Sequence, residues 1–120
     1  MANFHFFFLF TQNYGLNLLN YLKEFDNIEV VGTSVDGYNA LEIFKRAKPD
    51  VVTLDITLPG IDGLYVLEKM MSINPDSKII VITALKDKST GLKAVRLGAK
   101  GYIVKPFNLV KFTEVFKSLY

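Results

Sequence analysis

The sequence has no cysteine, no tryptophan and a single histidine, His5. Without cysteine the chain can form neither a disulfide framework nor a thiolate metal site, and one histidine cannot build a histidine-ligated metal centre. It also lacks any stretch of the roughly 20 apolar residues that a membrane-spanning helix requires. Of the common metal sites, these absences leave only a hard-cation site built from oxygen ligands.

The apolar start, MANFHFFFLF, does not have the composition of a signal peptide. Its apolar core, residues 6–10, is short for such a segment, no basic residue precedes it, and no small-x-small cleavage site follows. We therefore expect a cytoplasmic protein. With 120 residues, of which 50% are hydrophobic and 22% charged, the chain fits one globular domain over residues 1–120.

The charges are distributed unevenly along the chain. Residues 1–85 carry 6 basic and 10 acidic side chains, a net charge of −4, whereas residues 86–120 carry 8 basic and 2 acidic ones, a net charge of +6. Such a basic C-terminal segment can attract an acidic partner or nucleic acid. Its lysines are spaced too widely for a phosphate-backbone stripe, so a solvated face is the simpler interpretation and no direct nucleic-acid binding is expected.

Short apolar runs alternate regularly with segments of helical period, which is typical of a parallel α/β sheet. The predicted strands are residues 4–10, 29–33, 50–55, 78–83 and 101–104. Between and after the strands, five helices are predicted, four of them from an apolar stripe and the fourth in order over residues 89–97. The first stripe is Leu18, Leu19, Leu22 and Phe25; the second is Ala40, Leu41, Phe44 and Ala47; the third is Leu64, Leu67 and Met71; and that of the last helix is Leu109, Phe112, Phe116 and Leu119. Five βα units predict a flavodoxin-like (βα)5 three-layer sandwich with strand order 2-1-3-4-5.

Polar side chains follow three of the predicted strands. Asp55 ends the third strand, Thr83 ends the fourth, and Lys105 follows the fifth. In a parallel sheet ligands bind beyond the carboxyl ends of the strands, so these three groups are expected to meet. A carboxylate that attacks a phosphoryl group needs positive charge and hydrogen-bond donors around the phosphoryl oxygens, which Lys105 and Thr83 supply. Asp62 is better explained as a helix cap, as are Asp36 and Asn108.

Four segments then carry a family resemblance: EVVGTSVDGYNAL, TLDITLPGIDG, VITA and GAKGYIVKPF. Together they resemble the receiver domain of two-component response regulators, of the chemotaxis-regulator type, over nearly the whole chain. The resemblance implies that Asp55 is the phosphoacceptor, that Thr83 reorients toward the phosphoryl group, and that Lys105 is its ion-pair partner. It also implies that Tyr102 is an aromatic switch, although a strand aromatic packed on the core explains Tyr102 nearly as well.

The same resemblance implies further properties. Pro106 would follow a cis peptide bond, and Thr57 would offer a backbone carbonyl to Mg²⁺ beside Asp55. The phosphoryl donor would be a sensor histidine kinase or a phosphotransfer protein, and a downstream protein would bind the face around the fourth and fifth helices, where Tyr102 lies. Such a domain is not an enzyme beyond slow self-phosphorylation and self-dephosphorylation at Asp55.

The sequence departs from this family at the end of the first strand. Receiver domains carry an acidic pair there, which holds Mg²⁺ together with the phosphoacceptor; here the pair is replaced by Phe10 and Thr11, and no acidic residue occurs before Glu24. Because Mg²⁺ favours carboxylates and gives up water reluctantly, its binding is expected to be weak or absent. With no neighbouring carboxylates to repel it, Asp55 is then expected to pair with Lys105.

Three functions remain open from the sequence. The first is a phosphorylation-dependent switch; the second is a pseudo-receiver, an interaction module of the same fold that has lost Mg²⁺-dependent phosphorylation. The third, a flavin- or nucleotide-binding domain, is disfavoured because residues 11–15 lack phosphate-cradling glycine spacing. The phenylalanine-rich residues 6–10 are interpreted as a central core strand, with a surface for homodimer formation as the alternative.

Overall fold

A computed structural model describes residues 5–10, 20, 28–56, 62–83, 88–105 and 108–119. Within these residues the chain forms a five-stranded sheet in the order β2-β1-β3-β4-β5, and all paired strands are parallel. The strands are β1 (His5–Phe10), β2 (Ile28–Ser34), β3 (Val51–Asp55), β4 (Lys78–Thr83) and β5 (Gly101–Val104). The helices are α2 (Gly37–Ala47), α3 (Gly63–Ile73), α4 (Lys88–Arg96) and α5 (Leu109–Ser118). The α/β class with a flavodoxin-like parallel sheet is confirmed.

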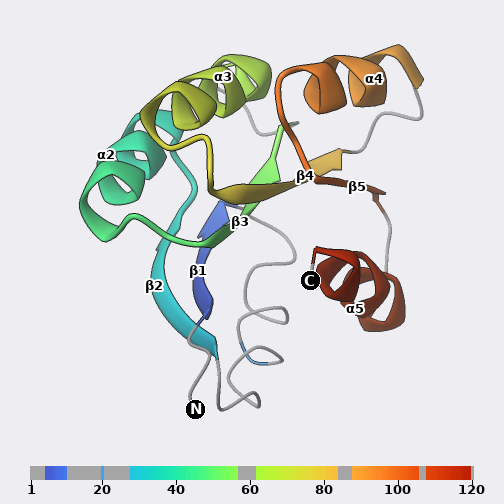
Figure 1. Cartoon of the computed structure of the whole chain (residues 1–120), viewed down its shortest axis with the longest axis horizontal. Helices are drawn as coiled ribbons and strands as arrows, with labels where there is room; N and C mark the ends of the chain where they lie inside the picture. The colour runs from blue at the N-terminus through green and yellow to red at the C-terminus, as the bar shows by residue number, and fades with distance from the viewer. Residues whose placement is uncertain are drawn as a thin grey trace.

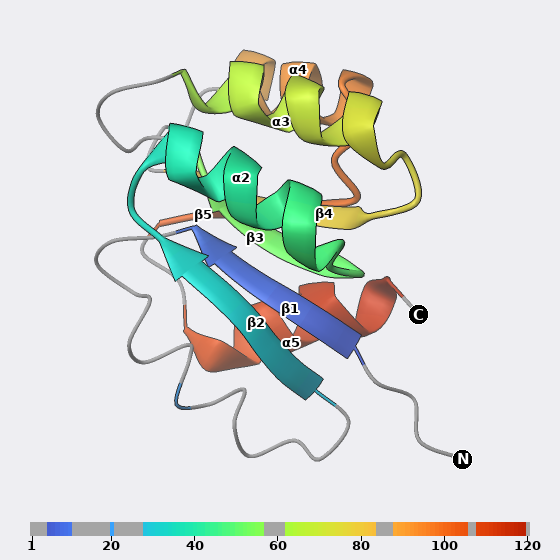
Figure 2. The same cartoon turned by 90° about the vertical axis from the view of Figure 1, so that its left-hand side faces the viewer.

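The helices cover the two faces of the sheet unequally. Figures 1 and 2 show α2, α3 and α4 side by side on one face and α5 on the opposite face. The helix expected over residues 18–25 falls almost entirely outside the described residues. From β1 the chain adds β2 on one side of the sheet and then β3, β4 and β5 on the other. The carboxyl ends of β1 and β3 therefore flank the switch point where ligands bind in sheets of this kind.

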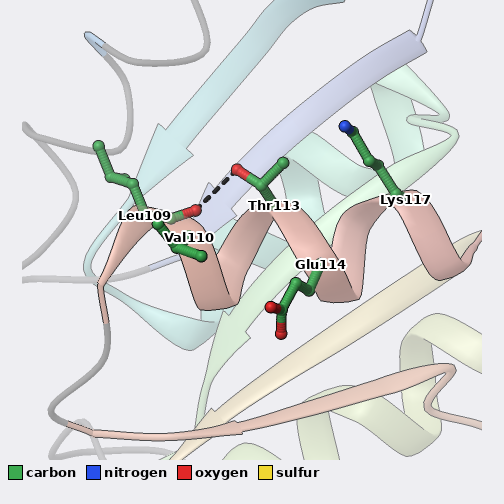
Figure 3. Close-up of a pocket in the computed structure, with 5 residues that line it drawn as sticks. All are labelled: Leu109, Val110, Thr113, Glu114 and Lys117. Carbon is green, nitrogen blue, oxygen red and sulfur yellow. Dashed lines mark hydrogen bonds between the residues drawn. The ribbon is translucent and has the colours of Figure 1, made fainter.

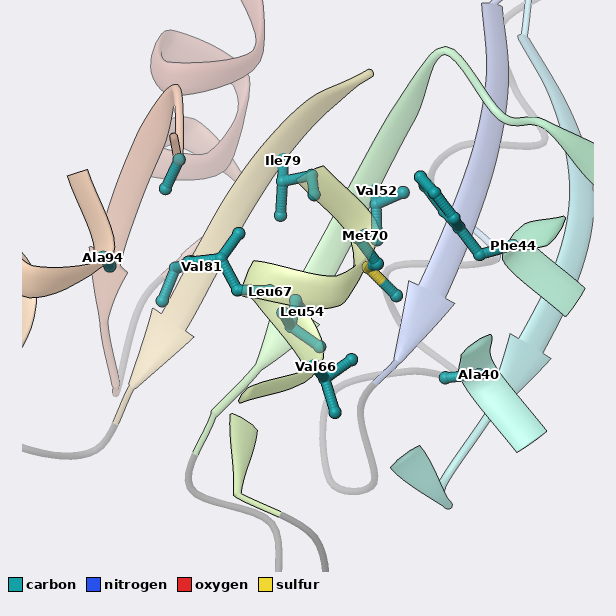
Figure 4. Close-up of a cluster of buried hydrophobic side chains, with 11 residues drawn as sticks. Ala40, Phe44, Val52, Leu54, Val66, Leu67, Met70, Ile79, Val81 and Ala94 are labelled. Carbon is teal, nitrogen blue, oxygen red and sulfur yellow. The ribbon is translucent and has the colours of Figure 1, made fainter. Parts of the chain in front are cut away.

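The strands β3 and β4 are buried on both faces, as their largely apolar sequences predict. All five residues of β3 are buried, and their side chains alternate between two cores. Val52 and Leu54 belong to the larger core, which α2 and α3 close with Phe44 and Met70 (Figure 4). On the other face, Val51 packs in a smaller core that contains Phe112 of α5.

Local capping sets where the helices begin. The carboxylate of Asp36 accepts a hydrogen bond from the backbone N–H of Tyr38 (2.9 Å), and Asp62 accepts one from Leu64 (3.0 Å). Asn108 caps α5 in the same way, by accepting from the N–H of Lys111 at 2.8 Å. These three bonds satisfy N–H groups that have no partner inside their own helices, and they confirm the predicted caps.

The packing of the helices corrects some details of the predicted stripes. Leu109 was expected on the packed face of α5 but is 39% exposed, because it stands in the first turn, where the helix has only begun to cross the sheet. In α3 the predicted stripe of Leu64, Leu67 and Met71 faces the larger core, with Leu67 fully buried and the other two partly buried; Val66 and Met70, which were not in the stripe, are also fully buried. Among the described residues, no helix combines the length and apolar character needed to cross a membrane.

The phenylalanine-rich segment occupies the interior of the sheet. β1 pairs with β2 on one side and with β3 on the other, so its backbone is a central strand, as expected. The pairing with β2 shifts register between Phe7 and Phe8.

Candidate functional site

Three neighbouring strands end at the same edge of the sheet with the polar residues that the sequence singled out. β3, β4 and β5 lie side by side in that order. Asp55 is aligned with Ile82 of β4, and Thr83 is aligned with Val104 of β5. Lys105 follows Val104 directly. The parallel register therefore brings Asp55, Thr83 and Lys105 to one edge, as the sequence predicts.

An ion pair joins the outer two of these residues. The Nζ atom of Lys105 pairs with Oδ2 of Asp55. The Asp55 side chain is fully buried, and the Lys105 side chain is only 12% exposed. A buried carboxylate without a compensating charge is strongly unfavourable, and Lys105 supplies a compensating charge to Asp55. The pair expected from the sequence is thus present.

Backbone hydrogen bonds hold the segments that follow the strands. The N–H of Lys105 donates to the carbonyl of Thr83 over 2.7 Å, and the N–H of Ile56 donates to the carbonyl of Ile82 over 2.9 Å. Both bonds extend the parallel ladder one residue past the ends of β3 and β5. These two bonds hold the backbone next to Asp55 and at Lys105 against β4, so the backbone positions of both charged residues are defined.

Thr83 and Tyr102 lie on the face of the sheet that α4 covers. Tyr102 is aligned with Val81, which is buried in the larger core, and residues two apart in a strand share a face. Thr83 is therefore on the same face as Val81, and it is fully buried. Tyr102 is partly buried and packs against the larger core. The two candidate switch residues therefore lie on the same face of neighbouring strands, two positions apart in register.

The residues present do not fit a magnesium ion of the kind the family resemblance implies. β1 is aligned so that Phe10 stands beside Leu54, the residue before Asp55, and no acidic residue occurs anywhere in β1. The described part of the chain contains no group of three or more acidic or histidine side chains that could hold a metal. The carboxylate of Asp55 is itself paired with an ammonium group. One neutralised carboxylate is a poor donor set for a hard divalent cation.

Three of the predicted site residues lie outside the described residues: Thr11, Thr57 and Pro106. The predicted magnesium contact of Thr57 and the cis peptide bond before Pro106 therefore remain predictions. Phe10 is described as the last residue of β1, through its backbone pairing.

A contact beside Asp55 was not predicted from the sequence. Gly63, the first residue of α3, is buried and faces Ile56; a Cβ atom at position 63 would lie 2.4 Å from the Cα atom of Ile56. Only glycine permits this approach, which sets α3 close to the residue that follows Asp55. A glycine directly after the capping residue Asp62 was the available signal, but a tight turn would give the same pattern.

A hollow elsewhere on the surface contains none of these residues. Its described lining comes from α5 alone, as Figure 3 shows: Leu109, Val110, Thr113, Glu114 and Lys117. The hydroxyl of Thr113 donates to the carbonyl of Leu109 over 2.7 Å, and that bond lies within the helix. The hollow thus has few convergent polar groups, and the strand-end cluster is the better candidate site.

Comparisons with known proteins show which sequences and structures this chain is similar to. A family model described as the response regulator receiver domain matches residues 14–117, starting after β1. Chemotaxis protein CheY of Thermotoga maritima is 38% identical over 91 residues, which cover 76% of both chains. Chemotaxis protein CheY of Treponema pallidum is 41% identical over 96 residues, covering 78% of this chain and 67% of the relative. A crystal structure of the CheX-CheY-BeF3-Mg²⁺ complex from Borrelia burgdorferi superposes with a TM-score of 0.85 at 27% identity, covering 97% of this chain and 88% of that one.

Proposed function

This chain belongs to the response regulator receiver domain family, and from that premise we propose that it receives a phosphoryl group on Asp55 in a two-component signalling pathway. The proposed donor is a sensor histidine kinase or a phosphotransfer protein. The proposal includes a cytoplasmic location and a role as a signalling switch rather than as an enzyme.

The observation that supports this function best is the meeting of Asp55, Thr83 and Lys105 at one sheet edge. Asp55 supplies a nucleophilic oxygen, and Lys105, already in contact with it, supplies positive charge. In the proposed transfer, a carboxylate oxygen of Asp55 forms a bond to phosphorus while the bond from phosphorus to the donor nitrogen breaks, and its electron pair stays on that nitrogen. Lys105 and the hydroxyl of Thr83 would then hold the phosphoryl oxygens. Since the donor set does not fit Mg²⁺, no step is assigned to a metal.

The proposed output surface lies along the last strand of the sheet and is formed by α4, β5 and α5. β5 is the last strand of the sheet, and α4 and α5 flank it on opposite faces (Figure 1). Exposed apolar side chains occur on both helices: Leu92 (56%) and Val95 (54%) on α4, and Val110 (67%) on α5. Apolar groups exposed on adjoining elements are typical of a protein-binding surface. A downstream protein partner at this surface is part of the proposal.

A pseudo-receiver is the second candidate, and two observations favour it. The donor set beside Asp55 does not fit the metal, and Asp55 is fully buried in its pair with Lys105. A phosphoryl donor can reach a buried carboxylate only after the surrounding site rearranges. In this alternative the ion pair is structural, and the domain acts through its surface alone.

Phosphorylation by a small donor distinguishes the two. The protein is incubated with phosphoramidate, whose phosphorus–nitrogen bond resembles that of a phosphohistidine, with and without MgCl2, and its intact mass is followed over time. The proposed function predicts slow gain of one phosphoryl group in the wild type and in Asp76→Asn, an exposed control, but none in Asp55→Asn. If the wild type gains nothing under either condition, the pseudo-receiver function is correct.

A further inference from the structure

The ring of Tyr102 occupies the space in which a side chain at position 91 would lie. Gly91 is buried in the middle of α4. A Cβ atom at this position would lie 2.8 Å from Cζ of Tyr102, 3.0 Å from Cε2 and 3.2 Å from Cε1. Since distances below about 3.4 Å are repulsive between carbon atoms, an alanine at position 91 and the present ring position exclude each other.

The backbone of α4 does not itself need a glycine at this position. Gly91 lies inside a regular helix. Among the described residues, positive φ angles occur at Lys48 and Gly98 and not at Gly91. A glycine inside a helix is unfavourable relative to alanine, because it loses more conformational freedom on folding. The close approach of the Tyr102 ring is the structural reason why α4 has a glycine at position 91 despite its lower helix preference.

The buried face of α4 is correspondingly small. Of residues 89–96 of α4, for which burial is described, Gly91 and Ala94 are buried, and because they are three positions apart they lie on the same side of the helix. Leu92 and Val95, which follow them in the sequence, are exposed. The Tyr102 ring therefore fills the space under α4 that larger side chains on the buried face of the helix would otherwise fill. The exposed residues Leu92 and Val95 belong to the same helix, so their position depends on the ring.

Tyr102 also connects this helix to the strand-end cluster. It is aligned with Val81 in β4, two residues before Thr83, on the same face of the sheet. The ring thus lies against Gly91 on the face of the sheet that Thr83 shares.

We infer that Gly91 is a positioning residue for Tyr102. Because Gly91 has no side chain, it leaves a space, here called the seat, that holds the ring against α4 and couples the ring to the exposed surface of that helix. The seat is a property of the unmodified chain. Its use in signalling rests on the proposed function, since it requires that partners bind the surface formed by α4, β5 and α5.

The first test measures the ring directly. Protein labelled with 3-fluorotyrosine has six tyrosines, and Tyr102→Phe identifies the ¹⁹F resonance of Tyr102. Gly91→Ala is expected to move that resonance toward the value of a solvent-exposed tyrosine and to leave the others in place. Lys93→Ala, an exposed change in the same helix, serves as the control and is expected to leave the Tyr102 resonance unchanged.

The second test uses folding equilibria, so that it does not depend on the spectrum. In a Tyr102→Ala background the seat is empty, and Gly91→Ala is expected to raise the folding equilibrium constant about two- to fivefold through the ordinary helix preference for alanine. In the wild-type background the same change is expected to lower it. Equal stabilisation in both backgrounds, or an unmoved Tyr102 resonance, overturns the inference. Both tests are made without a phosphoryl donor, so a failure of Asp55 to accept phosphate leaves their result intact.

Discussion

Lys105 pairs with Asp55 across the end of β4, although Asp55 ends β3 and Lys105 follows β5, two strands that are not neighbours in the sheet. β4 lies between them, with Thr83 as its last residue. The pair therefore spans three strand ends and ties the two outer segments together over the middle one. The two partners are unequal, because Asp55 is fully buried whereas Lys105 keeps 12% of its side chain exposed.

This inequality predicts different costs for removing either partner. Lys105→Met leaves the buried carboxylate without its counter-charge and is expected to lower the free energy of unfolding by about 3–5 kcal/mol. Asp55→Asn is expected to cost less, because the lysine can turn its ammonium group toward water. Urea denaturation of both variants and of the double variant measures these costs and their coupling.

The coupling from that cycle is expected to reach about 0.5–3 kcal/mol, as for residues in direct contact. Lys100→Met, which removes the same charge from an exposed position, is the control and is expected to change stability by no more than about 0.5 kcal/mol. Additive effects of the two single changes would contradict a structural role for the pair.

Magnesium is expected to have little effect on the unmodified chain. With Phe10 and Thr11 in place of carboxylates, a MgCl2 titration should give no saturable shift of the backbone amides of Asp55, Ile56 or Thr83 in the low millimolar range. The matched variant Thr11→Asp adds one carboxylate at the end of β1 and is expected to bind more tightly. Saturable shifts in the wild type would show that neutral oxygens suffice.

The contact between Gly63 and Ile56 predicts a sensitive position at the start of α3. Gly63→Ala places a methyl group against the backbone of Ile56, where no flexible side chain can yield, and should destabilise the fold by about 1–3 kcal/mol. Amide shifts of Asp55 and Ile56 should change with it. Glu68→Ala, on the exposed side of the same helix, should leave both unchanged.

Lys48 ends α2 with a left-handed backbone, φ 48° and ψ 57°, and its N–H donates to the carbonyl of Phe44. Because a side chain is unfavourable in this conformation, Lys48→Gly is expected to raise the free energy of unfolding by about 1 kcal/mol. Lys45→Gly, inside the same helix, should lower it by about 0.5–1 kcal/mol. Thermal unfolding of the two variants checks the opposite signs, and a loss of stability in both would refute the strain at Lys48.

Features that depend on near neighbours could be predicted from the sequence. Asp36, Asp62 and Asn108 were recognised as caps because each bonds to an N–H two or three residues further on. The apolar runs predicted which segments are buried strands, because a strand that is buried on both faces is mostly apolar in sequence. The placement of Asp55 at a strand end followed from the same pattern.

Helix faces were predicted less well, as Leu109 and Val66 illustrate. Leu109 continues the apolar stripe of α5, yet it is exposed, while Val66 lies outside the predicted stripe of α3 and is fully buried. Apolar spacing gives a helical period, but the angle at which each helix crosses the sheet decides which part of its surface is covered.

The sequence by itself determined the strands and helices that the structure describes, the polar residues at the strand ends and the absence of an acidic pair at the end of the first strand. Tertiary structure decided which distant groups share space: Lys105 with Asp55, Ile56 with Gly63, and Tyr102 with Gly91. The reason is physical. Capping and periodicity act over one or two turns of chain, whereas these contacts depend on the separation and rotation of packed layers, which no local sequence specifies.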